Sequence, residues 1–277
     1  MQRSLVALFR VCPLWGLYAV MAVVILFYMA FNRRGYGNAY RYFRLRFGCS
    51  PWRSFCNVYR NHYVFGQVVL DRFATYAGKR FRVEVEGQEL FDELEAGDAP
   101  FLLLSAHVGN YELAGYTLRS ARKRLYALVY AGETETVMEH RERIFRAHNI
   151  RMIPVRNDLS HLLLINEALS EGGIIGMPAD RLFGSTKSVV CNFLGAEAKF
   201  PAGPFAVAVQ RGIPALAIFV MKESLRGYRI HVRRLDAPAE GSAKARREAL
   251  ARAYAAELEQ ILRRYLTQWF NYYDFWA

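Results

Sequence analysis

His107 and Glu112 are the residues of this sequence whose types and spacing most directly suggest chemistry. They lie in the stretch LLLSAHVGNYEL, residues 102–113, where a run of leucines precedes them. Five residues of continuous helix turn a side chain roughly 140° away from the starting face, so the two cannot meet on one helix. They can meet if His107 lies in a turn after a strand and a helix begins near Gly109, with Glu112 in its first turn.

Such a pair would act as a general base. A carboxylate beside an imidazole fixes the tautomer of the ring and raises its basicity. Gly109 would give the turn its conformational freedom, and the N–H groups of Gly109 and Asn110 at the helix start would point at the same space. The structural alternative is that His107 bonds a backbone group and Glu112 only complements the helix dipole. The residues alone leave both interpretations open.

The elements that must position this pair form an α/β pattern. Short apolar runs predict strands at residues 81–85, 101–106, 125–130, 151–155, 173–178, 213–220 and 228–235. Helical patterns occur at 111–122, 133–148, 159–170, 203–210 and 242–266. Several strands are too uniformly apolar to have a wet face, so we expect a mixed, mostly parallel sheet covered by helices. Ligands of such sheets bind beyond the carboxyl ends of strands, and His107 falls at one.

The N-terminal region carries a candidate membrane anchor. Residues 11–31 contain no charge and are long enough to cross about 30 Å of hydrocarbon as a helix. Arginines are more numerous after this run than before it, which favours a cytoplasmic location for the rest of the chain. A signal peptide is the main alternative, but the run is long and no small-residue cleavage site precedes the arginines. The anchor either spans the membrane or is re-entrant, with a bend at Pro13 and Gly16.

Residues 35–79 combine arginines with aromatic residues, and the formal net charge of the chain is +12. Beside an apolar anchor, this pattern predicts interfacial helices with arginines reaching towards the lipid headgroups. The basic residues cluster near the anchor rather than on one soluble module, which argues against a nucleic-acid partner. We therefore expect three regions: an anchor at 1–34, interfacial helices at 35–80 and an α/β domain at 81–277.

Other site types lack their usual signatures. The four cysteines have neither CxxC nor Cys/His spacing, so neither a disulfide framework nor a structural zinc site is predicted. Motifs for a catalytic metal or a serine nucleophile elbow are also missing from the sequence. We expect no metal and no bound cofactor.

The stretch HVGNYE resembles the H-x4-D/E motif of the lysophospholipid acyltransferase superfamily, in the HxGNWE form of the bacterial lipid A late (lauroyl or myristoyl) acyltransferases. Residues 151–180 resemble that family's block of arginine, helix and glycine pair before an aspartate, with Arg156 and Asp180 in family-like positions. Residues 184–219 resemble the loop that follows. The sequence departs from the family at Tyr111, where tryptophan is commoner, and at Arg181, where glutamine or histidine is usual.

This resemblance implies an acyltransferase at the bacterial inner membrane, with its catalytic domain facing the cytoplasm. The donor would be an acyl-carrier protein or acyl-CoA thioester, and the acceptor a hydroxyl or amine of a lipid A precursor or related envelope lipid. His107 would take the acceptor proton and Glu112 would orient the imidazole. The residues expected to bind substrate are Gly109, Asn110, Arg156, Asp180 and Arg181.

Two alternatives remain open at this stage. The acceptor could be an amino-acid lipid, a glycolipid or a lysophospholipid, because the change at Arg181 puts the acceptor in doubt. The chain could also be a non-catalytic membrane-bound module that binds a lipid or a carrier protein on the same fold.

Overall fold

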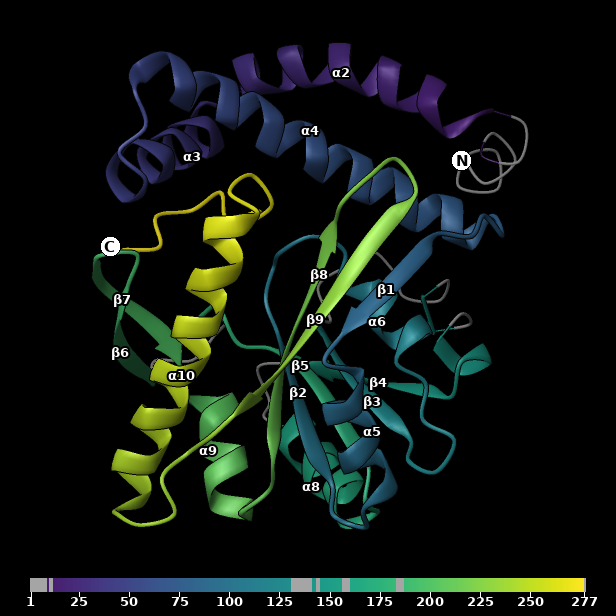
Figure 1. Ribbon diagram of the computed structural model, residues 1–277, viewed down its shortest axis with the longest axis vertical. Helices are drawn as coiled ribbons and strands as arrows, with labels where there is room; N and C mark the ends of the chain where they lie inside the picture. The colour runs from purple at the N-terminus through teal and green to yellow at the C-terminus, as the bar shows by residue number, and fades with distance from the viewer. Residues whose placement is uncertain are drawn as a thin grey trace.

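The seven-stranded sheet at the centre of the molecule is mostly parallel. The computed structural model describes residue 9 and residues 12–130, 141–142, 145–155, 160–182 and 187–276 (Figure 1). The strand order is β1-β9-β8-β2-β5-β3-β4, and β8–β9 is the antiparallel pair. The strands are β1 Arg82–Glu86, β2 Phe101–Ser105, β3 Leu125–Tyr130, β4 Ile150–Val155, β5 Ile174–Pro178, β8 Ala215–Lys222 and β9 Gly227–Leu235. The predicted α/β class and mixed sheet are confirmed.

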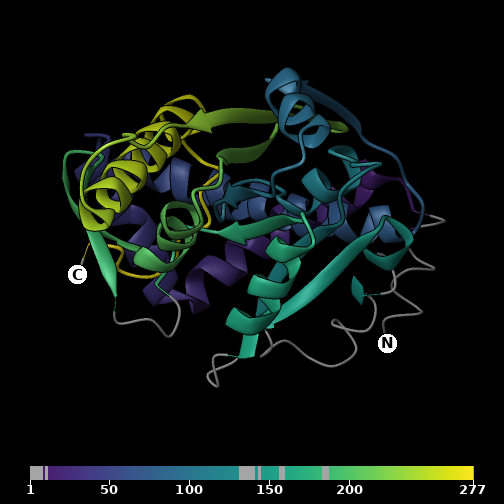
Figure 2. The ribbon, with the colours of Figure 1, turned by 90° about the horizontal axis from the view of Figure 1, so that it is seen from below.

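Helices cover both faces of this sheet, which explains the uniformly apolar strands. Along β2, Leu102 and Leu104 point into one buried cluster, while Phe101 and Leu103 point into the other. The first cluster includes residues of α8 Ser160–Ser170, α9 Ala202–Arg211 and α10 Ala243–Arg264. The second includes residues of α5 Gln88–Ala96 and α6 Glu112–Thr117. Figure 2 shows α9 and α10 on one side of the sheet. Every residue of β2 is therefore buried.

Several elements differ from the sequence prediction. Helix α5 and the hairpin of β6 Ser188–Phe193 and β7 Ala196–Pro201 were not predicted. Helix α6 ends at Thr117 rather than continuing to residue 122, because the following segment is bonded to α5 through Glu95, which accepts hydrogen bonds from Ser120 and from the Arg122 amide. The helix predicted at 133–148 falls largely outside the described residues.

Three N-terminal helices lie across one end of the sheet: α2 Leu14–Phe31, α3 Arg33–Arg46 and α4 Pro51–Tyr76 (Figure 1). Within the described part of the chain, α2 is the one helix long and apolar enough to cross a membrane, judged by length and composition. It begins directly after Pro13 and continues through Gly16 without a break, so the bend expected at Gly16 is absent from α2.

Helix α2 packs along α4 rather than standing away from the protein (Figure 1). Gly66 of α4 makes room for Met21, since a Cβ at Gly66 would lie 2.8 Å from the Met21 sulfur. The Tyr59 hydroxyl of α4 donates a hydrogen bond of 3.0 Å to the Ala22 carbonyl. The side of α2 that does not pack is apolar and exposed, and includes Trp15, Val20, Val23, Val24, Phe27 and Phe31.

A buried ion pair joins α4 to the sheet and to α2. Lys222 of β8 donates to Asp71 of α4 over 2.6 Å, and the hydroxyls of Tyr18 of α2 and Tyr228 of β9 also donate to Asp71. The Asp71 side chain is fully buried and the Lys222 side chain is 6% exposed. Because a buried charge is costly without a partner, this cluster fixes the position of α2 and α4 against the sheet.

We expect Lys222→Met to lower the free energy of unfolding by about 3–5 kcal/mol, because it leaves the Asp71 carboxylate buried without its counter-ion. The double variant Asp71→Asn/Lys222→Met removes both charges and should recover much of this loss. Urea unfolding of the detergent-solubilised full chain measures both values.

Lys244→Met is the matched control, because Lys244 is exposed. It should change the free energy of unfolding by less than about 0.5 kcal/mol. A Lys222→Met protein as stable as the control would show that the pair does not fix these helices.

Candidate active site

His107 lies two residues beyond the end of β2, where the backbone is held by the C-terminal tail, residues 265–276. The amide of Phe270 donates to the His107 carbonyl over 3.0 Å, and the amide of Gly109 donates to the Gln268 carbonyl over 3.0 Å. Val108 and Trp269 form an antiparallel bridge between these bonds. The tail therefore fixes the backbone around His107 as an added strand would.

Gly109 is required where the chain turns from β2 towards α6. Its φ is +46°, and a Cβ there would lie 1.8 Å from the Val220 carbonyl oxygen. The next amide, that of Asn110, donates to the same carbonyl over 2.8 Å. The amides of Gly109 and Asn110 are thus both bonded to backbone carbonyls. The expectation that they face the substrate is wrong, because the tail and β8 take up both donors.

The imidazole of His107 is oriented by Asp180, which follows β5. Nδ1 of His107 lies 2.7 Å from Oδ1 of Asp180, and the His107 amide donates to Oδ2 over 3.0 Å. The Trp269 indole also donates to Oδ2, over 3.2 Å. An ionised carboxylate accepts hydrogen bonds and cannot donate one. Nδ1 of His107 therefore carries the proton, and Nε2 is the basic nitrogen.

The charge of Asp180 is stable despite complete burial of the side chain. Burial by itself would raise the pKa of Asp180, but the charge of His107 and the hydrogen bonds from its ring and amide outweigh this and lower that pKa to about 2. The His107 side chain is 27% exposed. Among the described residues, the His107 ring makes a hydrogen bond through Nδ1 and none through Nε2. Nε2 can therefore receive a proton from a substrate.

Glu112 contacts other residues. It is the first residue of α6, so it lies in the first turn of that helix as predicted, and it is 5% exposed. Its carboxylate accepts a hydrogen bond of 2.8 Å from the Tyr76 hydroxyl and one of 3.2 Å from Arg141, and lies 3.4 Å from Arg72. The predicted contact between Glu112 and His107 is wrong, because the Glu112 side chain is turned towards α4 and two arginines.

Two arginines compensate the charge of Glu112 in this cluster. Burial would raise the pKa of Glu112, but the charges of Arg72 and Arg141 outweigh it and lower that pKa. Burial would lower the pKa of Arg72, and the Glu112 charge raises it on balance. Two guanidinium groups therefore face one carboxylate. Arg72 also lies over the Tyr111 ring, 4.7 Å from its centroid, and that ring meets the His107 ring edge-on at 6.2 Å.

The other residues predicted to bind substrate are engaged differently. The Asn110 side chain is fully buried, and its Oδ1 accepts from Arg72 over 3.3 Å. Arg181 donates to the Phe270 carbonyl over 2.5 Å and lies over the Tyr273 ring at 5.6 Å, so it holds the tail. Arg156 lies outside the described residues. Substrate binding by Arg156, Asp180 and Arg181 stays a prediction.

Sequence reasoning missed the side chains that support this centre. Trp269 and Gln268 come from the tail, and Arg72, Tyr76 and Arg141 come from helical segments. The aromatic richness of the tail was a signal for packing. The spacing of Arg72 and Tyr76 places them on one face of α4, but no local pattern connects them to Glu112.

The described part of the chain contains neither a metal-binding cluster nor a disulfide bond. No group of three His, Cys, Asp or Glu side chains there is arranged to hold a metal ion. The four cysteines are free thiols, as the sequence predicts.

One of three comparisons with known proteins shows a family for the chain. The sequence profile described as bacterial lipid A biosynthesis acyltransferase matches residues 72–276. A similar solved structure is the crystal structure of the 1-acyl-sn-glycerophosphate (LPA) acyltransferase, PlsC, from Thermotoga maritima. That structure has 15% sequence identity and a TM-score of 0.43, and the match covers 91% of this chain and 99% of that chain. The comparison with curated proteins gives no match.

Asp180 should make stability depend on pH in a defined window. Because its folded-state pKa is about 2 and its ordinary value is 3.8, its stabilising contribution is present above about pH 4 and is lost as the pH falls towards 2. Urea unfolding of wild type and Asp180→Asn between pH 2 and 6 measures it. The difference between the two proteins should shrink by about 2 kcal/mol on acidification. A constant difference would contradict an ionised Asp180.

Gly109→Ala should destabilise the protein by more than about 3 kcal/mol, because the added methyl group would overlap the Val220 carbonyl and force the turn to move. Gly195→Ala is the control, since Gly195 also has a positive φ, of +77°, but has nothing within 4 Å of its added Cβ. It should cost only about 1 kcal/mol. Thermal unfolding compares the two, and equal losses would show that the close approach at Gly109 is unimportant.

Proposed function

The chain belongs to the bacterial lipid A biosynthesis acyltransferase family, and we propose that it moves a fatty acyl group from an acyl-carrier protein or acyl-CoA thioester to a hydroxyl or amine of a lipid A precursor or related envelope lipid. Family membership makes the chain a lipid acyltransferase. The observation that carries the proposed mechanism is the His107–Asp180 pair, in which a buried carboxylate holds Nδ1 and leaves Nε2 open.

In the proposed reaction, His107 is the general base. Nε2 takes the proton of the acceptor hydroxyl or amine while the acceptor atom attacks the carbonyl carbon of the thioester. The bond between carbon and sulfur then breaks, and the imidazolium returns the proton to the leaving thiolate. Asp180 stays ionised throughout and stabilises the imidazolium, since its pKa lies far below neutral pH. The reaction needs no covalent intermediate on the enzyme.

The oxyanion of this reaction requires a source of positive charge. The amides of Gly109 and Asn110 are occupied by backbone carbonyls. We assign the role instead to the guanidinium group of Arg72, which lies over the Tyr111 ring that meets the His107 ring edge-on. In this proposal Glu112 holds the two arginines in position, and His107 receives its orientation from Asp180.

The proposed location is the inner membrane, with the α/β domain on the cytoplasmic side. Helix α4 contacts α2 through Tyr59 and Gly66 and contacts Glu112 through Arg72 and Tyr76. A membrane that contacts the exposed apolar side of α2 is therefore connected to the site through α4. This arrangement suits an acceptor lipid that stays in the membrane during transfer, and the arginines after α2 favour the cytoplasmic orientation.

Two other functions fit the same family. An acceptor such as an amino-acid lipid, a glycolipid or a lysophospholipid would use the same His107 chemistry with a different acceptor contact. A non-catalytic membrane-bound module for lipid or carrier protein would need no such base. The open Nε2 of His107 favours an enzyme, because a purely structural histidine has no need of an exposed ring nitrogen.

We expect His107→Ala to lower the rate of acyl transfer by about 10²–10⁴-fold, since the acceptor proton loses its base. Asp180→Asn should produce a loss of similar size, because asparagine can hold the other tautomer of the ring. Mass spectrometry of lipids from cells that carry each variant measures the product, as a mass increase of one acyl chain. His161→Ala on α8 is the control and should leave the product unchanged.

Glu112→Gln distinguishes the role of Glu112 from that of Asp180. It removes the buried negative charge that Arg72 and Arg141 both contact, so we expect it to lower the free energy of unfolding by about 3 kcal/mol. A folded His107→Ala protein that makes the normal product would reject the catalytic proposal. A Glu112→Gln protein with wild-type stability and no activity would instead place Glu112 in the chemistry.

A further inference from the structure

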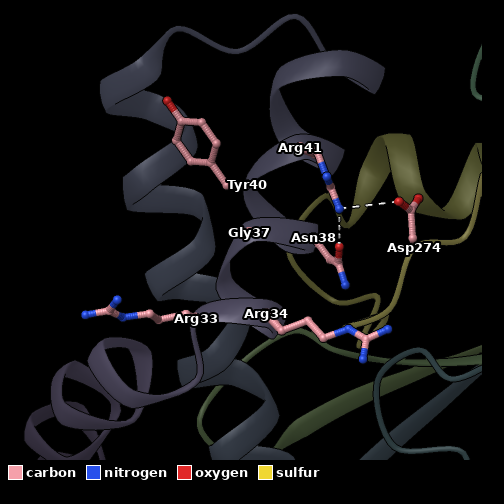
Figure 3. A pocket seen from close by; sticks show the side chains of 7 residues that line it. All are labelled: Arg33, Arg34, Gly37, Asn38, Tyr40, Arg41 and Asp274. Atoms are coloured by element: carbon pink, nitrogen blue, oxygen red, sulfur yellow. Dashed lines mark hydrogen bonds and ion pairs between the residues drawn. The ribbon is translucent and has the colours of Figure 1, made fainter.

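Helix α3 carries a basic cavity that the acyl-transfer proposal does not use. It has a volume of about 480 Å³ and is lined by Arg33, Arg34, Gly37, Asn38, Tyr40, Arg41 and Asp274 (Figure 3). Gly37 leaves the middle of the cavity open, because nothing lies within 4 Å of a Cβ built on it. Figure 3 shows Arg34 and Arg41 on the same side of the helix, with Asn38 between them.

The charges of this cavity are not balanced within the described part of the chain. Arg41 donates to Asn38 over 2.6 Å and forms an exposed ion pair of 3.3 Å with Asp274. Arg33 and Arg34 make no hydrogen bond or ion pair with the described residues. They also occupy the first turn of α3, where the helix dipole disfavours positive charge. The cavity therefore has positive charge that a bound anion would neutralise.

An aromatic groove adjoins the basic cavity and shares Tyr40 with it. The groove has a volume of about 510 Å³ and is lined by Tyr36, Tyr40, Pro51, Trp52 and Phe55. Trp52 is 71% exposed and stacks on Phe55 at 5.6 Å between ring centroids. An exposed tryptophan beside a cationic cavity is typical of the membrane interface, where one part of a lipid is charged and the next is apolar.

The location of the two hollows relates them to the membrane helix. Asn32 alone separates Arg33 from Phe31, the last residue of α2, and the Phe31 side chain is 85% exposed. If α2 lies in hydrocarbon, the basic cavity at its end is at the level of the lipid phosphates.

We propose that α3 binds one anionic phospholipid of the surrounding leaflet. Its phosphate lies over Gly37, with Arg34 and Arg41 on one side and Arg33 on the other (Figure 3), and its glycerol and upper acyl chains lie along Tyr40 and Trp52. The site is separate from His107 and goes beyond the proposed acyl transfer, so its test needs no measurement of activity. An acidic carrier protein is the competing partner, but the exposed aromatic groove favours a lipid.

The test uses the full chain in detergent, titrated with phosphatidylglycerol or phosphatidylcholine that carries brominated acyl chains. Bromine quenches tryptophan fluorescence on contact, and comparison with Trp52→Phe isolates the signal of Trp52. For wild type we expect half-maximal quenching of Trp52 at about tenfold lower phosphatidylglycerol than phosphatidylcholine, because Arg33 and Arg34 have no ion pair that competes with the phosphate. Arg33→Gln/Arg34→Gln should bring the two lipids within about twofold of each other.

Arg211→Gln/Lys244→Gln is the matched control, because it removes two exposed charges, one at the last residue of α9 and one in the first turn of α10. Figure 1 shows these helix ends at the opposite end of the molecule from α3. It should keep the tenfold preference, and Asp274→Asn should increase it by removing the carboxylate of the cavity. A preference that survives Arg33→Gln/Arg34→Gln overturns the proposal, as does one that the control abolishes. Loss of acyl-carrier protein binding in Arg33→Gln/Arg34→Gln, with unchanged lipid preference, would assign the surface to the carrier and also overturn it.

Discussion

The structure depends on one electrostatic constraint: a carboxylate buried in a protein must find its compensating charges and donors inside the protein. Among the residues that the structure describes, three carboxylates meet this constraint, those of Asp71, Glu112 and Asp180, each no more than 5% exposed. Their partners come from segments distant in sequence, such as Lys222 for Asp71 and His107 for Asp180. Because a misplaced partner would leave a buried charge unpaired, each carboxylate selects one arrangement of helix, strand and tail. The fold and the site are in this sense specified by the same interactions.

The three carboxylates differ in the type and exposure of the groups that compensate their charge. At Asp71, the lysine and the two tyrosine hydroxyls that donate to it are themselves buried, so the cluster is structural. At Glu112, the surrounding arginines lower its pKa, and a carboxylate held between two cations is a poor base. At Asp180, the main partner is the His107 ring, whose far nitrogen is open. The same constraint therefore gives a fixed helix at Asp71, a pair of positioned arginines at Glu112 and an oriented imidazole at Asp180.

The sequence predicts the parts of the fold that depend on local pattern. Uniformly apolar runs such as that of β2 indicate strands buried on both faces, and they place His107 correctly at a strand end. The partner of His107 was assigned wrongly, because Glu112 is near in sequence while Asp180 is 73 residues away and brought close by the neighbouring strand β5. The β6–β7 hairpin was missed because its turn uses Leu194 with a positive φ, a conformation that few side chains adopt. Tertiary contacts, rather than propensity, decide these cases.

Helix α4 connects α2, the candidate membrane helix, to the side chains around His107. One part of its surface receives α2, and another part carries Arg72 and Tyr76 to Glu112 at the sheet ends. Because α4 is continuous between these contacts, the distance from the exposed side of α2 to His107 is set by packed side chains. A lipid acceptor held at the surface of the leaflet would then meet the base at a fixed depth. The C-terminal tail contacts both regions. Trp269 donates a hydrogen bond to Asp180, and the same segment continues to Asp274 beside α3. A lipid bound at α3 as proposed would therefore contact the chain segment that holds the His107–Asp180 pair.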